Sequence, residues 1–337
     1  MVDWVSCVVP CYHTEPIHGD KIMRITPDGE SVWQTLTAKS VEGSYSDKIM
    51  LKTHSLDGDS NPSHIYISGN PVKFFQGHNI FGHNNPHTLT LALLNYLTEQ
   101  LPQLQPTPQQ REWWGVGAYE FTRVDLNSMF SLGSYPAVND WLRSAEFSSR
   151  TRHGRPAMKG GTLYWGKNSR RWSLKAYSKG EEIQKHLPTR ALPEQLQDWT
   201  NDKLRLELTL RQMELKESGA HVAANWASGH TTAQGLYSQY IAKLNMVDNM
   251  RIDHDQLITQ LPARLAGTYV KWRDGYDLLS LMTRRTFYRH RKELLAYGVD
   301  ITNKAPPRET SNVVPLVRVV EAVPCEVPDW VADSDLY

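Results

Sequence analysis

The stretch at residues 170–179 carries the side chains best suited to chemistry on a phosphate ester. Within it, the hydroxyl of Tyr177 is flanked by the amines of Lys175 and Lys179. Cations near a tyrosine favour its phenolate form and hold a phosphate diester for attack by the phenolate oxygen. The simpler interpretation is a surface tyrosine at the end of an amphipathic strand, and this stretch alone favours the simpler one.

The same stretch is predicted to be the second strand of a β-hairpin. Residues 161–166 supply the first strand, and the turn-forming sequence Lys-Asn-Ser at 167–169 joins the two. Alternate side chains of a strand point to opposite faces of its sheet. Lys175 and Tyr177 therefore share one face, whereas the apolar side chains of this strand share the other.

Two further predicted strands repeat the pattern of one apolar and one polar face. The strand predicted over residues 113–130 places Arg123 and Asp125 on its polar face. A later segment alternates strictly between leucine and polar residues, and the polar ones include Arg205 and Glu207. If the three strands are neighbours in an antiparallel sheet, their polar side chains converge on one surface.

Such a surface could cleave a phosphate diester. Asp125 and Glu207 would offer hard oxygen ligands to Mg²⁺ or Mn²⁺, which would polarise the scissile phosphate. Arg123, Arg205 and the two lysines would hold the phosphate oxygens, and Tyr177 would attack in line to form a phosphotyrosine. The simpler interpretation of each arginine–carboxylate pair is an ion pair on a solvated face. The coincidence of three such strands, one of them with a tyrosine, favours the catalytic interpretation.

His78 lies in a glycine-bounded loop, predicted over residues 70–82 at the end of a strand. It is a candidate metal ligand or DNA contact, although a single histidine in a turn more often stabilises its own loop. No two histidines of the chain are separated by one residue. The two-histidine metal motif of many nicking enzymes is therefore absent from the sequence.

A basic helix is predicted near the C-terminus, over residues 284–297, after a shorter helix at 276–282. A short helix, a turn and a basic helix resemble a helix-turn-helix, whose second helix enters a major groove of DNA. The alternative is a solvated basic face, but the excess of cations over acids favours DNA. The candidate DNA-contacting cations are Arg284, Arg285, Arg289 and Lys292.

Composition sets outer limits on these interpretations. The chain has 337 residues and a formal net charge of +1, which neither supports nor excludes nucleic acid as a partner. Its three cysteines lack metal-like spacing to histidine and fit a reducing compartment. Neither a signal peptide nor an apolar run of membrane length is recognisable in the sequence. We therefore expect a cytoplasmic protein with no membrane partner.

The chain resembles the replication initiators of filamentous phages, the gene II protein family, over nearly its full length. The most specific segments are residues 70–73 (Asn-Pro-Val-Lys), 76–82 (Gln-Gly-His-Asn-Ile-Phe-Gly) and 312–318 (Asn-Val-Val-Pro-Leu-Val-Arg). The order of an Arg-x-Asp strand, a strand tyrosine and an Arg-x-Glu strand is also similar to plasmid rolling-circle initiators.

The resemblance implies a metal-dependent endonuclease with strand-transfer and ligase activity. Its tyrosine, Tyr177 in this chain, would join covalently to the 5′ phosphate at a double-stranded phage origin, and the free 3′ hydroxyl would prime rolling-circle synthesis. Implied partners are the origin DNA, the host replicative helicase and polymerase, and further copies of the chain on DNA, all in the bacterial cytoplasm. The family also implies a shorter C-terminal product, for which Met246 or Met250 is a candidate start.

We therefore expect an α+β protein of two domains. Residues 1–245 would form the nicking and closing domain, with a central antiparallel sheet and flanking helices. Residues 246–337 would form a smaller, helical, helix-turn-helix-like domain that binds DNA. One alternative is a non-catalytic regulator that binds the origin through the basic helix. Another is a metal-dependent nuclease that uses water and leaves no covalent adduct.

Overall fold

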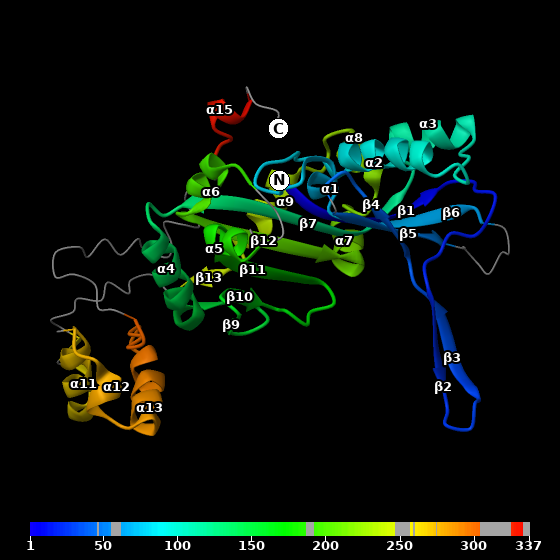
Figure 1. Cartoon of the computed structure of the whole chain (residues 1–337). Coiled ribbons are helices and arrows are strands. Elements are labelled where there is room, and N and C mark those ends of the chain that lie inside the picture. The colour runs from blue at the N-terminus through cyan, green and yellow to red at the C-terminus, as the bar shows by residue number, and fades with distance from the viewer. Residues whose placement is uncertain are drawn as a thin grey trace.

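A nine-stranded antiparallel sheet organises the first two thirds of the chain (Figure 1). The computed structural model describes residues 1–45, 47–54, 62–186, 192–246, 257–258, 260–273, 275–303 and 325–332. In spatial order the strands are β4 (Lys39–Glu42), β5 (Lys48–His54), β6 (His64–Gly69), β1 (Val2–Pro10), β7 (Glu120–Ser131), β12 (Lys203–Arg211), β11 (Trp172–Ser178), β10 (Thr162–Trp165) and β9 (Ala157–Lys159).

The three strands with polar faces are neighbours, which meets the condition for their polar side chains to converge on one surface. β12 lies between β7 and β11, and β10 pairs with β11 to complete the predicted hairpin. In the register of β11 and β12, Lys175 lies opposite Glu207 and Tyr177 lies opposite Arg205. Cross-strand partners share a face of the sheet, so these side chains and Asp125 of β7 point the same way.

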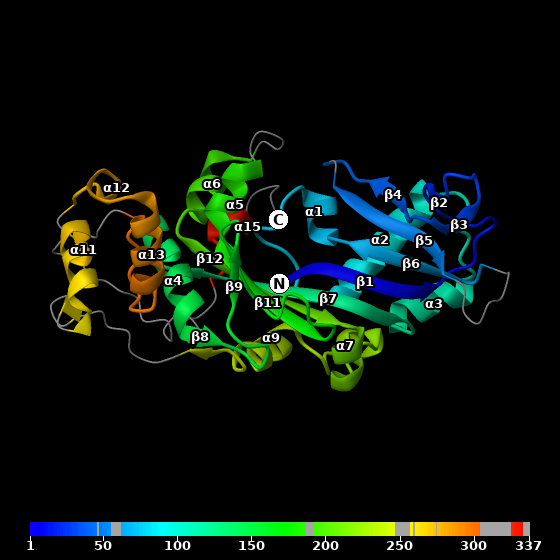
Figure 2. The same ribbon diagram turned by 90° about the horizontal axis from the view of Figure 1, so that it is seen from below.

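The other face of the sheet packs into the main hydrophobic core. The four leucines of β12 are fully buried there beside side chains of α2 (Pro86–Gln100), α4 (Tyr135–Ser148) and α9 (Ala233–Ile241). Burial of one leucine side chain stabilises a fold by about 1.5–3 kcal/mol. Figure 2 shows α1 (Pro71–Gln76), α5 (Lys179–His186) and α6 (Glu194–Thr200) on the opposite side of the sheet from α7 (Gln212–Ser218) and α9.

The structure has helices at two places where the sequence predicted a loop or a strand. Residues 71–76 form α1 and not a loop, because Asn70 caps Lys73 N at 2.9 Å and a proline follows the cap. The strand predicted from residue 113 is wrong at its start. There α3 (Pro108–Val116) begins at a Thr107–Gln110 capping box, and β7 starts only at Glu120. At both places a local cap signal starts a helix, where a loop was predicted in the first case and a strand in the second.

A separate hairpin, formed by β2 (Lys21–Ile25) and β3 (Ser31–Leu36), projects from the body of the molecule (Figure 1). Every residue of its two strands is exposed. The hairpin leaves the body between Gly19 and Thr37, whose backbone N–H and C=O are 2.8 Å apart. It therefore takes no part in the core that positions the polar face.

The C-terminal helices form their own hydrophobic cluster. α12 (Leu278–Leu281) and α13 (Arg284–Leu295) confirm the predicted pair of helices, and Thr283 caps α13 as expected. They pack with α11 (Ala263–Arg273), which the sequence interpretation missed. The strand predicted at 313–319 and Met250 lie outside the described residues. The remaining elements are α8 (Ala223–Ala227), α15 (Asp329–Ala332), β8 (Ser149–Arg150) and β13 (Asn245–Met246).

Candidate active site

A cavity of about 380 Å³ opens on the polar face of the sheet. Five side chains that the sequence singled out line it together: Arg123, Asp125, Lys175, Tyr177 and Glu207. The sequence interpretation did not include the other lining residues, which are Asp3, Trp4, Asp47, Lys48, Asn70, Lys73, Asn79 and Glu182. β1 supplies the first two of these, and the loops around α1 supply the two asparagines.

Tyr177 is held by the carboxylate of the neighbouring strand. Its hydroxyl donates a hydrogen bond to Glu207 Oε1, and the ammonium of Lys175 lies 2.5 Å from Glu207 Oε2 and 5.5 Å from the centre of the tyrosine ring. Glu207 is buried, whereas Lys175 and Tyr177 are half-buried at the cavity wall. The three side chains therefore form one chain of charge-assisted contacts from solvent to the sheet.

The surroundings of Tyr177 favour the neutral phenol. Burial raises the pKa of Tyr177 well above its ordinary value, and the nearby carboxylates, Glu207 first among them, add to the rise. Arg205 lowers that pKa only in part. The expectation that flanking cations favour the phenolate is therefore wrong, because Lys175 is paired with Glu207 and its charge is largely cancelled. A base must remove the phenolic proton, and Glu207 already accepts its hydrogen bond.

Arg205 is buried below the cavity and forms hydrogen bonds to three residues that line it. Its guanidinium is fully buried and donates to Asp3 Oδ1 at 2.8 Å, to Glu207 Oε1 at 3.0 Å and to the carbonyl of Asn79. With its donors engaged in this way, Arg205 is a positioning residue and not the phosphate ligand that the sequence suggested. The buried guanidinium balances two buried carboxylates, which would otherwise be very costly to keep ionised.

Asp3 is the main site residue that sequence reasoning missed. Its Oδ1 accepts hydrogen bonds from Asn70 at 3.0 Å and Asn79 at 2.7 Å, besides the one from Arg205. Burial alone would raise the pKa of Asp3, but Arg205 and the Asn79 hydrogen bond bring it below its usual range. The pairing of β1 with β7 shifts register between Val2 and Trp4, and such a bulge re-aims a side chain. The sequence signal that could have identified Asp3 is the presence of an aspartate within an otherwise apolar strand.

Lys179 lies at the start of α5, behind the cavity wall. It is buried and donates to Asn79 Oδ1 at 2.9 Å and to Glu182 Oε2 at 2.6 Å. Burial and the charge of Arg205 lower its pKa to about 8, against the pull of Glu182. The cation that shares the face of Tyr177 is therefore Lys175, and Lys179 anchors the loop of Asn79.

The lowered pKa of Lys179 predicts a dependence of stability on pH. Above pH 8 the folded chain binds fewer protons at Lys179 than the unfolded chain, so the free energy of unfolding rises as pH increases from about 8 to 10.5. Relative to a Lys179→Met variant, we expect the wild-type chain to gain about 2 kcal/mol between pH 7.5 and 9.5. Urea unfolding at several pH values measures this difference, and parallel curves for the two chains would contradict it.

Asp125 forms its own ion pair on the cavity wall. Arg123 donates to it twice, at 2.8 and 2.6 Å, and also lies over the ring of Trp4 at 5.2 Å. Burial raises the pKa of Asp125, Arg123 partly offsets this, and the nearby carboxylates Asp3 and Glu207 raise it further. Asp125 therefore sits among like charges that a cation would relieve.

The carboxylate oxygens of Asp125 and Glu207 are the type of ligand that Mg²⁺ and Mn²⁺ prefer. In this structure they are already paired with Arg123 and Lys175. Among the described residues, no group of three histidine, cysteine or acidic side chains is arranged to hold a metal. An ion could reach Asp125 or Glu207 only by displacing Arg123 or Lys175. Both of these cations are partly exposed, with 41% and 36% of their side chains accessible.

His78 lies apart from these carboxylates. It is buried in the turn after α1, where its Nδ1 is 3.2 Å from Gln76 Nε2, and it does not line the cavity. The position matches the simpler interpretation of a histidine that stabilises its own loop. A ligand role for His78 stays a prediction.

Comparison with known proteins identifies the family to which this chain belongs. A family model that describes the N-terminal part of the gene II replication-associated protein matches residues 1–229, and a model of the C-terminal part of the same protein matches residues 254–336. The chain belongs to the gene II family of replication-associated proteins. The resemblance to the replication initiators of filamentous phages is thereby confirmed.

Individual gene II relatives match along most of the chain. The replication-associated protein of Enterobacteria phage I2-2 is 39% identical over 333 residues, which cover 97% of this chain and 95% of that protein. The replication-associated proteins of Enterobacteria phages M13 and f1 are each 26% identical over 323 residues, covering 79% of this chain and 76% of theirs.

The two gene II family models divide most of the structure between them, although Val331 of the C-terminal match packs in a cluster with Ile80, Phe81, Met129, Ile183 and Leu196 of the N-terminal match. The N-terminal match contains the whole sheet and the cavity, and the C-terminal match contains α11 to α13. Residues 230–253 lie between the matches, so the predicted domain boundary at residue 245 stays a prediction. None of the helices in the described residues has the length and apolar character needed to cross a membrane.

The basic helix α13 presents its cations to solvent. Phe287, His290 and Leu294 face the C-terminal core. Arg291 is tied to Asp300 by two hydrogen bonds, at 2.9 and 2.8 Å. The four candidate DNA contacts are all exposed: Arg284, Arg285, Arg289 and Lys292. The exposed ring of Tyr288 lies among them, so this face combines positive charge with an aromatic surface.

Proposed function

We propose that this chain nicks one strand of a phage replication origin, rejoins it, and so starts rolling-circle replication. The observation that supports this most directly is the hydrogen bond from the Tyr177 hydroxyl to Glu207, inside a cavity lined by both cations and carboxylates. Membership of the gene II family supplies the setting of phage DNA replication. The proposed enzyme is an endonuclease and ligase with a tyrosine nucleophile.

The proposed reaction is a transesterification at phosphorus. Glu207 accepts the phenolic proton while the Tyr177 oxygen attacks the phosphorus, a tyrosine–phosphate bond forms, and the bond to the 3′ oxygen breaks. The 3′ oxygen takes a proton from solvent and becomes the hydroxyl that primes synthesis. The 5′ phosphate stays on Tyr177, so the bond energy is kept and no ATP is required. Attack by a 3′ hydroxyl on the phosphotyrosine reverses these steps and closes the strand.

The partly exposed cations of the cavity wall would bind the scissile phosphate. Lys175 and Arg123 can turn from their carboxylates toward a phosphate that enters the cavity. Lys48 and Lys73 add positive charge at the cavity rim. Charge develops on the phosphate oxygens during attack, and fixed cations stabilise it most in a site that excludes water.

A requirement for Mg²⁺ or Mn²⁺ remains part of the proposal. Asp125 and Glu207 would hold the ion, which would supply Lewis-acid polarisation of the phosphate. The residues described above would still orient Tyr177 and accept its proton. Removing the ion by chelation tests this part separately from the nucleophile.

The exposed face of α13 would bind double-stranded origin DNA. We expect host replicative helicase and polymerase to act on the nicked product, and further copies of the chain to assemble on the origin, in the bacterial cytoplasm. These partners follow from the family and not from a surface of the molecule.

The test of the function is a reaction of the full chain with supercoiled DNA that carries the phage origin, in the presence of Mg²⁺. We expect nicked and relaxed DNA with protein attached at the 5′ end, and mass spectrometry should find the nucleotide adduct on Tyr177. Added EDTA should stop the reaction if an ion is needed. Binding without cleavage would instead support the non-catalytic regulator. Cleavage without an adduct would support a nuclease that uses water.

A further inference from the structure

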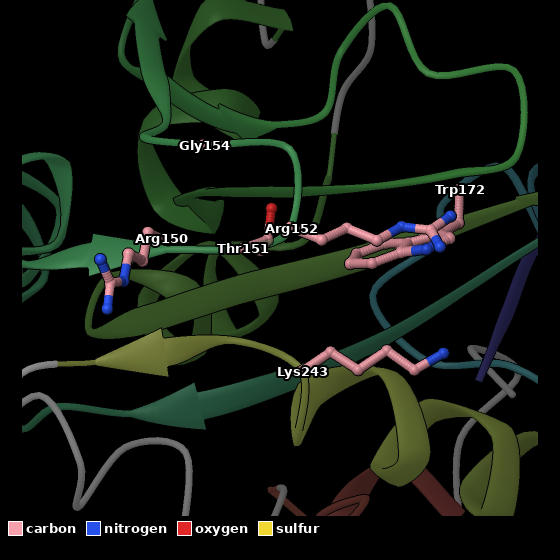
Figure 3. Close-up of a pocket in the computed structure, with 6 residues that line it drawn as sticks. All are labelled: Arg150, Thr151, Arg152, Gly154, Trp172 and Lys243. Carbon is pink, nitrogen blue, oxygen red and sulfur yellow. The ribbon is translucent and has the colours of Figure 1, made fainter.

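A second cavity, of about 600 Å³, lies on the other face of the sheet from Tyr177 (Figure 3). Its lining residues are Arg150, Thr151, Arg152, Gly154, Trp172 and Lys243. Trp172 begins β11 and points to the same side as Leu174 and Ala176, away from Lys175 and Tyr177. The cavity is therefore separate from the candidate active site.

One strand pair and a tight turn build this cavity. β8 pairs with β13, which brings the turn after Arg150 beside the end of α9 and Lys243. Thr151 and Gly154 exchange two backbone hydrogen bonds, at 3.0 and 2.9 Å. Gly154 has φ +92°, a conformation that side chains disfavour, so the turn needs glycine at this position.

The cations of the cavity are arranged around an indole. The guanidinium of Arg152 lies 5.6 Å from the ring centre of Trp172. The ammonium of Lys243 lies 5.7 Å from the same centre and 3.7 Å from the ring centre of Tyr240. Figure 3 shows these two cationic side chains extending in the same direction along Trp172, whereas Arg150 points away from them. Contacts with an aromatic face hold both charges in place without neutralising them.

The nearest carboxylate leaves this positive charge largely available. Glu214 is buried and lies 4.0 Å from both Arg152 and Lys243. Its closer partners are Arg171 at 3.0 Å and the hydroxyl of Tyr240 at 2.6 Å. About half of the Arg152 side chain and 40% of the Lys243 side chain are accessible to solvent.

The indole N–H of Trp172 is sealed from solvent. Trp172 is fully buried, and its Nε1 has no hydrogen-bond partner among the described residues. The charged donors of this cavity are the guanidinium of Arg152 and the ammonium of Lys243, a pair that suits an anion with several oxygens.

We propose that this cavity binds a phosphate of the DNA sugar–phosphate backbone, at a point away from the nicked bond. The inference rests on the proposed action on DNA. The cavity offers cations and donors but no array that could read base edges, so the contact is independent of sequence. It would fix the path of the DNA on the far face of the sheet while Tyr177 reacts on the near face.

Salt dependence of DNA binding tests the proposal. We expect the double variant Arg152→Gln/Lys243→Gln to lower the slope of log K against log salt by about 0.7–0.9, the change for loss of one phosphate contact. The matched control Arg143→Gln/Lys216→Gln removes two charges from exposed pairs outside the cavity and should leave the slope unchanged. An unchanged slope in the cavity variant, or an equal fall in the control, would overturn the proposal.

Two further measurements separate the alternatives. Calorimetry with inorganic phosphate and with a deoxynucleoside triphosphate tests for a free anion; binding that the cavity variant loses, with its DNA slope unaltered, would assign the cavity to small phosphates and overturn the DNA contact. Adduct formation at Tyr177 on a short single-stranded oligonucleotide should be equal in the cavity variant and the wild type. Loss of the adduct in both proteins would instead refute the nicking function.

Discussion

A Tyr177→Phe variant should form no covalent adduct with origin DNA and should keep its affinity for that DNA. The substitution removes the attacking oxygen and the hydrogen bond to Glu207, but leaves the ring and its contact with Lys175. Removal of an enzyme nucleophile typically lowers the rate by on the order of 10⁴-fold or more. Denaturing gels of the protein with labelled DNA measure the adduct, and gel shifts measure binding.

Tyr164→Phe is the matched control for this experiment. Tyr164 lies on the adjacent strand β10, opposite Lys175 in the register, and does not line the cavity. We expect that variant to nick and rejoin DNA at the wild-type rate. If Tyr177→Phe retained nicking with an adduct, the nucleophile would have to be another tyrosine.

Arg205→Met should destabilise the sheet domain by about 3–5 kcal/mol, the usual effect of breaking a buried ion pair by removing one partner. The guanidinium is fully buried and is the closest cation to Asp3, with Glu207 also hydrogen-bonded to it. Without it, at least one carboxylate would take up a proton or draw in water. Nicking should also fall, since Glu207 would lose its orientation toward Tyr177.

Chemical denaturation followed by tryptophan fluorescence measures this loss of stability. Arg143→Met, which breaks an exposed pair with Asp140, should change stability by less than about 1 kcal/mol. Adding Asp3→Asn to Arg205→Met should restore part of the loss, because the two side chains interact directly. A loss below about 1 kcal/mol in Arg205→Met would show that the guanidinium is not needed to balance these carboxylates.

The alternation of β12 and β11 predicted which side chains meet. A strand places every second residue on one face, so the partners Lys175, Glu207 and Tyr177 followed from parity once the strands were neighbours. Helix starts are specified in the same local way, as the capping side chains of Asn85 and Thr283 at the starts of α2 and α13 show. The same signal at Asn70 preceded α1, where a loop was expected instead.

The charge state of the site could not be predicted from sequence. Lysines at positions 175 and 179 are equally close to Tyr177 along the chain, yet one is half-exposed at the cavity and the other is buried against Glu182. The pKa of Tyr177 depends on burial and on which carboxylates stand near it. Those distances exist only after residues far apart in sequence have packed together.

The sequence by itself determined the polar and apolar faces of the strands, the basic face of α13 and the kinship with gene II proteins, because these depend on residue type and short spacing. Only the tertiary structure brought Asp3 and Asn79 to Arg205, across 202 and 126 residues of chain. It also placed Lys243 beside Arg152 on Trp172. Such contacts follow from strand order, a bulge and helix packing, which no local pattern specifies.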